Sequence, residues 1–182
     1  MKKILLHSCC APCSAYVIQE LQKEYKVTLF YFNPNIFPKE EYQKRLAEAK
    51  EYCQKIKVDF IEAEYDHGLW LEKIKGYENE PERGKRCQIY YQLRLEKTAL
   101  EAKKMGCSIF CSTLSISPHK DAQMINKIGL ELSKEYRIEY LESDWKKQEG
   151  FKKACDISRE EGFYRQEYCG CEFTLLNSIA KR

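Results

Sequence analysis

Short apolar runs of β type alternate along this chain with longer segments of helical periodicity, and this alternation restricts its fold most. The apolar runs predict strands over residues 3–6, 26–32, 58–62, 108–112 and 137–141. The helical segments cover residues 12–24, 38–56, 67–74 (capped by Asp66), 87–105, 119–136, 145–160 and a short stretch from 172. Each return to a parallel strand needs a crossover, which a helix supplies. The sequence therefore predicts an α/β fold, with a parallel sheet of about five strands and helices on both faces.

Length and composition indicate one globular domain. The 182 residues suffice for one core, so we expect a single domain over residues 1–182. A hydrophobic fraction of 43% and a charged fraction of 32% exclude a disordered or fibrous chain. No apolar run reaches the roughly 18 residues that a bilayer span needs, so we expect a cytoplasmic protein with no membrane partner. The net charge of +3 permits contact with RNA without requiring it.

Cysteine is the residue type that departs most from average composition. Ten cysteines among 182 residues are many for an intracellular chain but too few for a disulfide scaffold, which indicates metal binding or redox chemistry. Six of them cluster in polar turns, where core packing gives no reason for a thiol: Cys9, Cys10, Cys13, Cys87, Cys169 and Cys171. The other four fit buried positions and are predicted to be structural: Cys53, Cys107, Cys111 and Cys155.

The six clustered cysteines fall where a site is expected in an open α/β sheet, outside the carboxyl ends of the strands. The group at residues 9–13 opens a helix, whose positive end should lower the thiol pKa values, and Lys85-Arg86 should do the same for Cys87. Asp144 follows the fifth strand and adds a carboxylate. Because the spacing is irregular and lacks paired C-x2-C knuckles, the set favours an iron-sulfur cluster over structural zinc.

Several separated motifs carry a family resemblance. They are HSCCAPC at 7–13, FNPNI at 32–36, EPERGKRC at 80–87, RL at 94–95, STLSISPHK at 112–120 and YRQEYCGC at 164–171. Together they resemble the QueH-type epoxyqueuosine reductases over nearly the whole chain. The resemblance implies a Rossmann-like fold of the HUP type and the last step of queuosine biosynthesis, in which the epoxide of epoxyqueuosine at the tRNA wobble position is reduced to the alkene.

The same resemblance implies an iron-sulfur cluster, which we expect to be 4Fe-4S, room for one additional iron, and no cobalamin. Cys9, Cys10, Cys87, Cys169 and Cys171 match the family's metal-binding cysteines, with Cys13 close by. The sequence departs from the family where Tyr90 replaces a second cysteine three residues after Cys87, and where Trp145-Lys146 rather than Phe-Arg follow Asp144.

One division of the ligands is hypothesised. Cys10, Cys87 and Cys169 would hold most of the cluster, while Cys9 and Cys171, with or without Asp144, would hold a neighbouring iron. A cluster with one iron not saturated by thiolate could pass electrons one at a time and polarise the departing oxygen.

The reaction also needs a proton donor, an electron donor and a way to hold RNA. The candidates for proton donation are Tyr90, His119 and a metal-bound water, and no spacing argument separates them. The partners implied are a tRNA that carries epoxyqueuosine and an external electron donor. Thirteen Tyr and eight Phe supply platforms on which loop bases could stack.

Two other classes of function fit part of the sequence. Cys10-Ala-Pro-Cys13 after a strand is also typical of a thioredoxin-like dithiol oxidoreductase, although the CGC segment would then have no role. A zinc-stabilised RNA-binding module without catalysis is the second alternative. A nucleotide-activating enzyme is disfavoured, because the first strand-helix turn lacks the glycines of a phosphate cradle.

Overall fold

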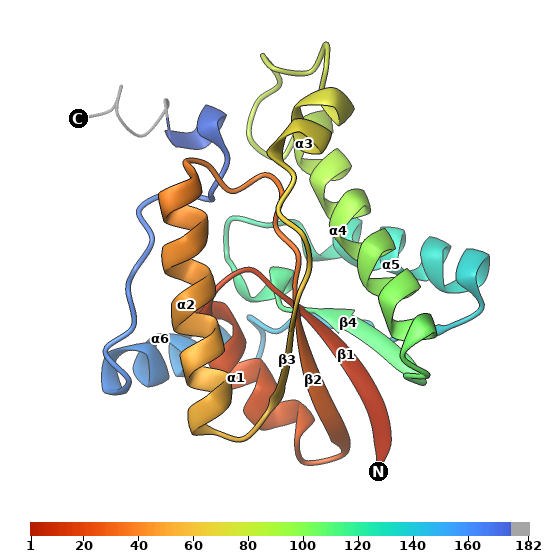
Figure 1. The fold of residues 1–182 in the computed structure, drawn as a ribbon, viewed down its shortest axis with the longest axis vertical. Coiled ribbons are helices and arrows are strands. Elements are labelled where there is room, and N and C mark those ends of the chain that lie inside the picture. The colour runs from red at the N-terminus through yellow and green to blue at the C-terminus, as the bar shows by residue number, and fades with distance from the viewer. Residues whose placement is uncertain (176–182) are drawn as a thin grey trace.

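A five-stranded, all-parallel sheet forms the centre of the molecule. The computed structural model describes residues 1–175 of the 182 (Figure 1). The strands are β1 (Lys2–Ser8), β2 (Tyr25–Tyr31), β3 (Asp59–Glu62), β4 (Ile109–Ser112) and β5 (Glu139–Tyr140), in the order β3-β2-β1-β4-β5. The predicted α/β, Rossmann-like sheet of five strands is confirmed.

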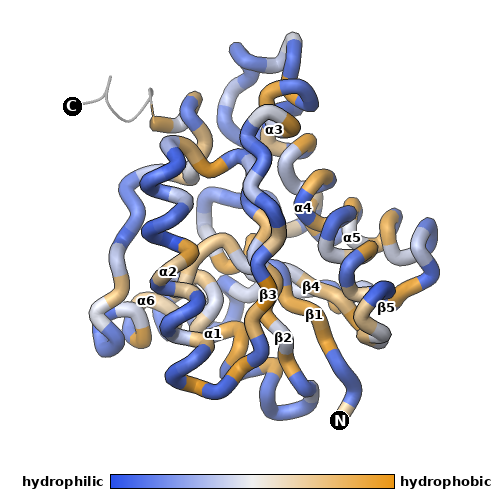
Figure 2. Tube along the Cα trace, in the orientation of Figure 1, coloured by the Kyte–Doolittle hydropathy of each residue, from blue (hydrophilic) through white to orange (hydrophobic). Residues whose placement is uncertain are grey.

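Helices cover both faces of this sheet. One face carries α1 (Ala11–Leu21), α2 (Lys39–Lys55) and α6 (Gly150–Glu160), and the other carries α3 (His67–Lys73), α4 (Lys85–Lys104) and α5 (Ala122–Tyr136). A 3-10 helix, η1 (Leu114–Ile116), follows β4. Apolar residues concentrate on the central strands and polar residues on the peripheral helices and loops (Figure 2).

Period-two alternation along the strands divides the apolar residues between two cores. In β1, Ile4 and Leu6 pack under α1 and α2, whereas Leu5 packs under α4. In β4, Cys111 joins the first core and Phe110 the second. Both faces of these central strands are buried, as expected for parallel strands with helices on each side. The two cores therefore share one sheet.

The strand order places a topological switch point between β1 and β4. The chain runs outward from β1 through β2 to β3, and then returns to place β4 on the other side of β1. At such a point the loops that follow the two central strands diverge and leave a crevice for a ligand. The Cys9-Cys10 pair follows β1, and η1 and Lys120 follow β4, so the fold brings both to this crevice.

Two helices begin later than the sequence predicts. The prediction that a helix starts at His119 is wrong, because the Asp121 carboxylate caps α5 by accepting hydrogen bonds from the Gln123 and Met124 backbone N–H groups at 2.9 and 3.1 Å. The prediction of a helix from Trp145 is wrong as well, since α6 begins at Gly150.

Trp145 is held by β4 and η1 instead. Its indole N–H donates to the Ser112 carbonyl at 3.0 Å, and its backbone N–H donates to Ser115 Oγ at 3.3 Å. Positive φ values at Gln148 and Glu149 then turn the chain into α6. Of the helix predicted from Glu172, residues 172–175 are helical and the remainder lies outside the described residues. No helix in the described part of the chain is long and apolar enough to cross a bilayer.

Candidate metal centre and active site

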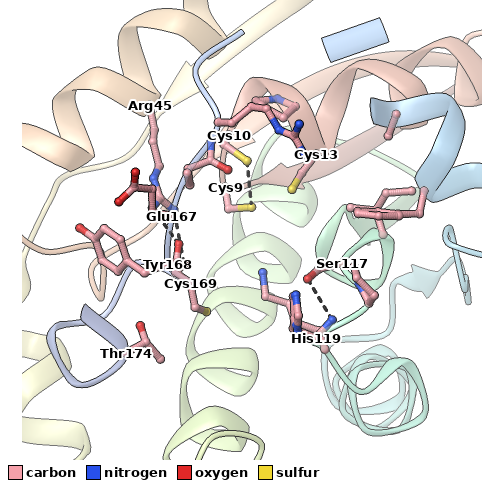
Figure 3. Close-up of a pocket in the computed structure, with 18 of the residues that line it drawn as sticks. Cys9, Cys10, Cys13, Arg45, Ser117, His119, Glu167, Tyr168, Cys169 and Thr174 are labelled. Carbon is pink, nitrogen blue, oxygen red and sulfur yellow. Dashed lines mark hydrogen bonds between the residues drawn. The ribbon is translucent and has the colours of Figure 1, made fainter. Parts of the chain in front are cut away.

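A cavity of about 660 Å³ lies at the carboxyl edge of the sheet, at the switch point. Its walls come from the turn after β1, the start of α4, the turn after β4, α6 and the segment that follows α6 (Figure 3). Five of the six cysteines predicted to bind metal line it: Cys9, Cys10, Cys13, Cys87 and Cys169. The structure therefore brings together thiols that lie up to 160 positions apart in the sequence (169 − 9).

Cys9, Cys10 and Cys13 form the first thiol group. Their sulfur atoms all lie within 4.8 Å of one another, and Cys9 Sγ is 3.7 Å from Cys10 Sγ. Two thiolates on one tetrahedral ion, with bonds of about 2.3 Å, would lie about 3.8 Å apart. These three cysteines could hold a metal ion.

The local sequence sets this geometry. Cys10 is the N-cap of α1 in an extended conformation, and a proline follows in the first helical turn. Ser14 Oγ donates to the Cys10 carbonyl at 2.7 Å, and Asn33 Nδ2 donates to the Ser8 carbonyl at 2.9 Å. The turn is thus fixed from both sides before any metal binds.

The three thiols of this group differ in how readily they ionise. Hydrogen bonds from Cys10 and Cys13 hold the pKa of Cys9 well below its ordinary value. A hydrogen bond from Cys13 favours the Cys10 thiolate, but the bond to Cys9 and burial outweigh it and raise the pKa of Cys10 to about 12. The pKa of Cys13 is raised by its hydrogen bonds to Cys10 and Cys9 and by burial. The prediction of lowered pKa values is therefore confirmed for Cys9 and wrong for the other two.

Cys87, Cys169 and Cys171 form the second thiol group. Each interacts electrostatically with the others, although Cys171 does not line the cavity. The Arg83 backbone N–H donates to Cys87 Sγ at 3.3 Å. Burial nevertheless raises the pKa of Cys87 to about 11, and it outweighs the effect of Arg86, which lowers that pKa as the sequence predicts.

Arg45 ties the CGC segment to α2. Its side chain is 2% exposed, and Nε donates to a Glu41 carboxylate oxygen at 2.7 Å. Its Nη1 and Nη2 donate to the backbone carbonyls of Cys169 and Tyr168 at 3.3 and 3.2 Å. Gly170, between the two cysteines, adopts φ +125°, and a Cβ there would lie 3.2 Å from Arg45 Nη1. Only glycine allows this close approach without strain.

Further cations surround the thiols. Arg94 is 1% exposed and donates from Nε and Nη2 to Asn35 Oδ1 at 3.0 and 2.5 Å. Lys120 lines the cavity. Burial alone would lower the pKa of Lys120, but the Cys9, Cys169 and Cys13 sulfurs raise it above its ordinary value. These positive charges favour a site that holds several thiolates.

Two of the three predicted catalytic residues line the cavity. The Tyr90 hydroxyl lies 3.9 Å from Cys169 Sγ, and burial raises the pKa of Tyr90 well above its ordinary value, so the phenol stays protonated. His119 is exposed at the edge of the cavity, and its backbone N–H donates to Ser117 Oγ at 3.3 Å. Asp144 does not line the cavity; its carboxylate pairs with Lys146 at 3.1 Å and with Lys147 at 3.8 Å.

Sequence reasoning missed three residues of this cavity. Arg45 looks like one partner of an ordinary Glu41 pair on a helix, and only its burial shows its role. Lys120 sits in the STLSISPHK motif, which marks the segment but not the ammonium group. Cys155 fits a helix stripe and was predicted to be structural, but it lines the cavity from α6.

Comparison with known proteins identifies the family. Residues 4–177 match the family model "Epoxyqueuosine reductase QueH". A protein of that name from Acinetobacter baylyi is 42% identical over 178 residues, which are 97% of this chain and 82% of that protein. Another from Streptococcus pyogenes serotype M1 is 39% identical over 176 residues, 93% of this chain and 69% of that protein.

A solved structure shares the fold alone. It is a predicted subunit of tRNA methyltransferase from Methanocaldococcus jannaschii, with a TM-score of 0.58 and 15% identity, and the match covers 87% of this chain and 76% of that one. The fold, the thiols around one cavity, the family model and the relatives agree, and the chain belongs to the QueH family of epoxyqueuosine reductases.

Proposed function

We propose that this chain is an oxidoreductase that reduces the epoxide of epoxyqueuosine to the alkene of queuosine in the tRNA anticodon. The observation that carries the proposal is the convergence of five cysteines from three distant segments on one cavity, in a chain of this family. The reaction consumes two electrons and two protons, and the epoxide oxygen leaves as water. An external one-electron donor supplies the electrons, and tRNA is the partner. We place the reaction in the cytoplasm, and residues 1–182 act as one domain.

The donor set fits an iron-sulfur cluster. Thiolates are the ligands that such clusters take, and the cations Arg45, Arg94 and Lys120 offset their charge. When bound, a 4Fe-4S cluster supplies electrons one at a time. The spacing of the thiols supports a division different from the one hypothesised from the sequence, with Cys9, Cys10 and Cys13 in one centre and the second thiol group in the other. Asp144 would join either centre only by leaving its lysine partners.

Tyr90 is the proposed proton donor. Its phenol stays protonated, it lies against Cys169, and it faces the cavity. His119 stands at the exposed edge and is better placed to pass protons from water toward the cavity. The cavity volume lies within the roughly 300–1,000 Å³ typical of small-molecule sites, which suits one nucleoside extruded from the loop. Tyr168 and Phe151 line the cavity and offer ring faces to the base.

Anaerobic purification followed by iron and sulfide counts, an electron paramagnetic resonance spectrum and a conversion assay tests this function. The reduced protein should contain iron and sulfide, show a cluster signal and convert tRNA-bound epoxyqueuosine to queuosine. Colourless protein with stoichiometric zinc and no conversion would instead favour the RNA-binding module, and iron-free protein that reduces insulin disulfides would favour the dithiol oxidoreductase.

A pair of cysteine variants tests the assignment of the site. Cys169→Ser removes a thiol that lines the cavity and should abolish both cluster absorption and turnover. Cys53→Ser is the control and should leave both unchanged, because Cys53 is a fully buried core residue of α2 that does not line the cavity. Equal losses in the two variants would refute the sorting of the cysteines.

A further inference from the structure

Lys120 differs from the three buried arginines near the thiols because its charged group has no partner within the described residues 1–175. The Arg45 guanidinium donates to Glu41 and two carbonyls, and Arg94 donates twice to Asn35. Arg86 donates to the carbonyls of Glu78 and Glu80. Within residues 1–175, by contrast, the Lys120 ammonium has no hydrogen bond or ion pair, although it lines the cavity. Its three N–H donors are available to a ligand.

Lys120 interacts with both thiol groups. Its charge interacts with Cys9 and Cys13 of the first thiol group and with Cys169 of the second. The ammonium is therefore within electrostatic reach of sulfurs from both groups, in the cavity that a substrate would enter.

The backbone that carries Lys120 is held in place by several hydrogen bonds. The Arg83 guanidinium donates to the Pro118 and His119 carbonyls, each at 3.0 Å. The Lys120 N–H donates to the Ser117 carbonyl at 3.2 Å, and the Lys120 carbonyl accepts from Lys146 Nζ at 3.4 Å. The next residue caps α5. A donor presented from such a preorganised turn costs little reorganisation during a reaction.

We propose that Lys120 is a catalytic residue that donates a hydrogen bond to the epoxide oxygen and stabilises the negative charge that develops on it. As the two carbon–oxygen bonds break, the carbon pair gains two electrons from the external one-electron donor and becomes the alkene. The oxygen takes up two protons, delivered from water through Tyr90 or His119, and leaves as water. Lys120 stays protonated throughout. This inference rests on the proposed function.

A binding measurement tests Lys120 without turnover. An anticodon stem-loop carrying epoxyqueuosine and one carrying queuosine differ only by the epoxide oxygen, and without reductant neither reacts. Oxidised, cluster-loaded wild-type protein should bind the epoxide form more tightly by about tenfold or more, as expected for a hydrogen bond from a charged donor. Lys120→Met should bind both forms equally, and Lys120→Arg should keep part of the preference.

A single-turnover measurement tests the effect of Lys120 on the rate of epoxide reduction. With a chemical one-electron reductant, Lys120→Met should react about a hundredfold more slowly than wild type while keeping its iron content and spectrum. Lys127→Met is the matched control, because Lys127 is exposed on α5 and does not line this cavity; it should match wild type in both measurements.

The outcomes separate this inference from the function. The role of Lys120 would be overturned if Lys120→Met converted the tRNA at the wild-type rate or still preferred the epoxide form. Either result would leave the proposed function unaffected. Loss of iron in both Lys120→Met and Lys120→Gln would also overturn it, since Lys120 would then serve the metal site. Wild-type protein that neither converts the tRNA nor distinguishes the two stem-loops would contradict the proposed function itself.

Discussion

Arg45 is the residue on which the geometry of the second thiol group depends most directly. Its buried guanidinium holds two carbonyls of the CGC segment and lies over the Tyr168 ring, 5.4 Å from its centre. A buried cation with this many donors in use cannot be replaced by an uncharged side chain without leaving carbonyls unpaired.

We expect Arg45→Met to lower the free energy of unfolding by about 3 kcal/mol and to reduce iron retention. Denaturant unfolding and iron counts after gel filtration measure the two effects. Glu41→Gln is the matched control, because it removes the ion pair but leaves the bonds to the CGC carbonyls, and it should keep the iron. Full iron content in Arg45→Met would show that the CGC segment does not depend on this contact.

Burial separates reactive from inert thiols in the same chain. Desolvation raises the pKa of Cys53 to about 12, so at pH 8 its thiolate fraction is about a thousandfold below that of a thiol with a pKa near 9. Cys155 is half-buried at the cavity. Iodoacetamide at pH 8 should therefore label Cys155 within minutes and Cys53 only after unfolding. Mass spectrometry of the loaded protein checks this, and early labelling of Cys53 would contradict its burial on the core face of α2.

Among the individual residues of the site, the sequence identifies the cysteines better than the buried lysine and arginines. Six cysteines stand out because clusters such as CCAPC and CGC have no reason to occur in polar turns. Arg45 and Lys120 carry no such mark, since lysine and arginine are mostly solvated and only tertiary contacts bury them. Cys155 could not be told from a core cysteine because its helix has one face on the core and an edge on the cavity.

Among the elements, the contact of α5 with β5 depends on the absence of a side chain. A Cβ at Gly129 would lie 2.4 Å from two atoms of the Tyr140 ring, which is 6% exposed. Glycine costs a helix roughly 1 kcal/mol relative to alanine, so the gain in close packing must outweigh that loss.

We expect Gly129→Ala to lower the unfolding free energy by about 1–3 kcal/mol, because the overpacking exceeds the gain in helix propensity. Thermal unfolding of the variant measures the effect. The double variant Gly129→Ala, Tyr140→Leu should lose less than the sum of the two single changes, because the smaller side chain makes room for the methyl group. An increase in stability in the single variant would show that α5 can move away from β5.

Two element boundaries differ from those that helical periodicity predicts, one because of a local cap and one because of tertiary contacts. Periodicity starts the last two long helices at His119 and Trp145, but Asp121 caps α5, and hydrogen bonds from Trp145 to β4 and η1 keep that residue out of α6. The Asp66 cap was predictable because its effect is local: the carboxylate accepts from the Leu69 N–H at 3.0 Å. Asp121 gives the same kind of local signal, which the periodicity masked, whereas the contacts of Trp145 are long-range and leave no mark in the sequence.

For the whole molecule, the parallel sheet and the switch point follow from the order of strands and helices, so the location of the site could be predicted. The cations that contact the RNA phosphates could not be predicted from the sequence. Most cations of the α6 region are paired: Lys152 lies 3.6 Å from Glu149, and Arg159 pairs with Asp156. Paired cations release few counterions when RNA binds.

Arg165 is the better candidate for a phosphate contact. It is exposed, lines the mouth of the cavity, and has no hydrogen bond or ion pair within the described part of the chain. Arg165→Gln should therefore weaken tRNA binding and reduce the slope of log K against log salt by about 0.7, the value for one contact to a single-stranded loop.

Arg159→Gln, which removes an equal charge from a paired position on α6, should leave that slope nearly unchanged. The salt dependence of tRNA affinity is measured for both variants by equilibrium binding, at salt concentrations from about 50 to about 200 mM. Equal slopes for the Arg165 and Arg159 variants would place the RNA backbone elsewhere on the molecule. A loss confined to Arg165→Gln would mean that the phosphate chain enters across the same mouth through which the nucleoside reaches the thiols.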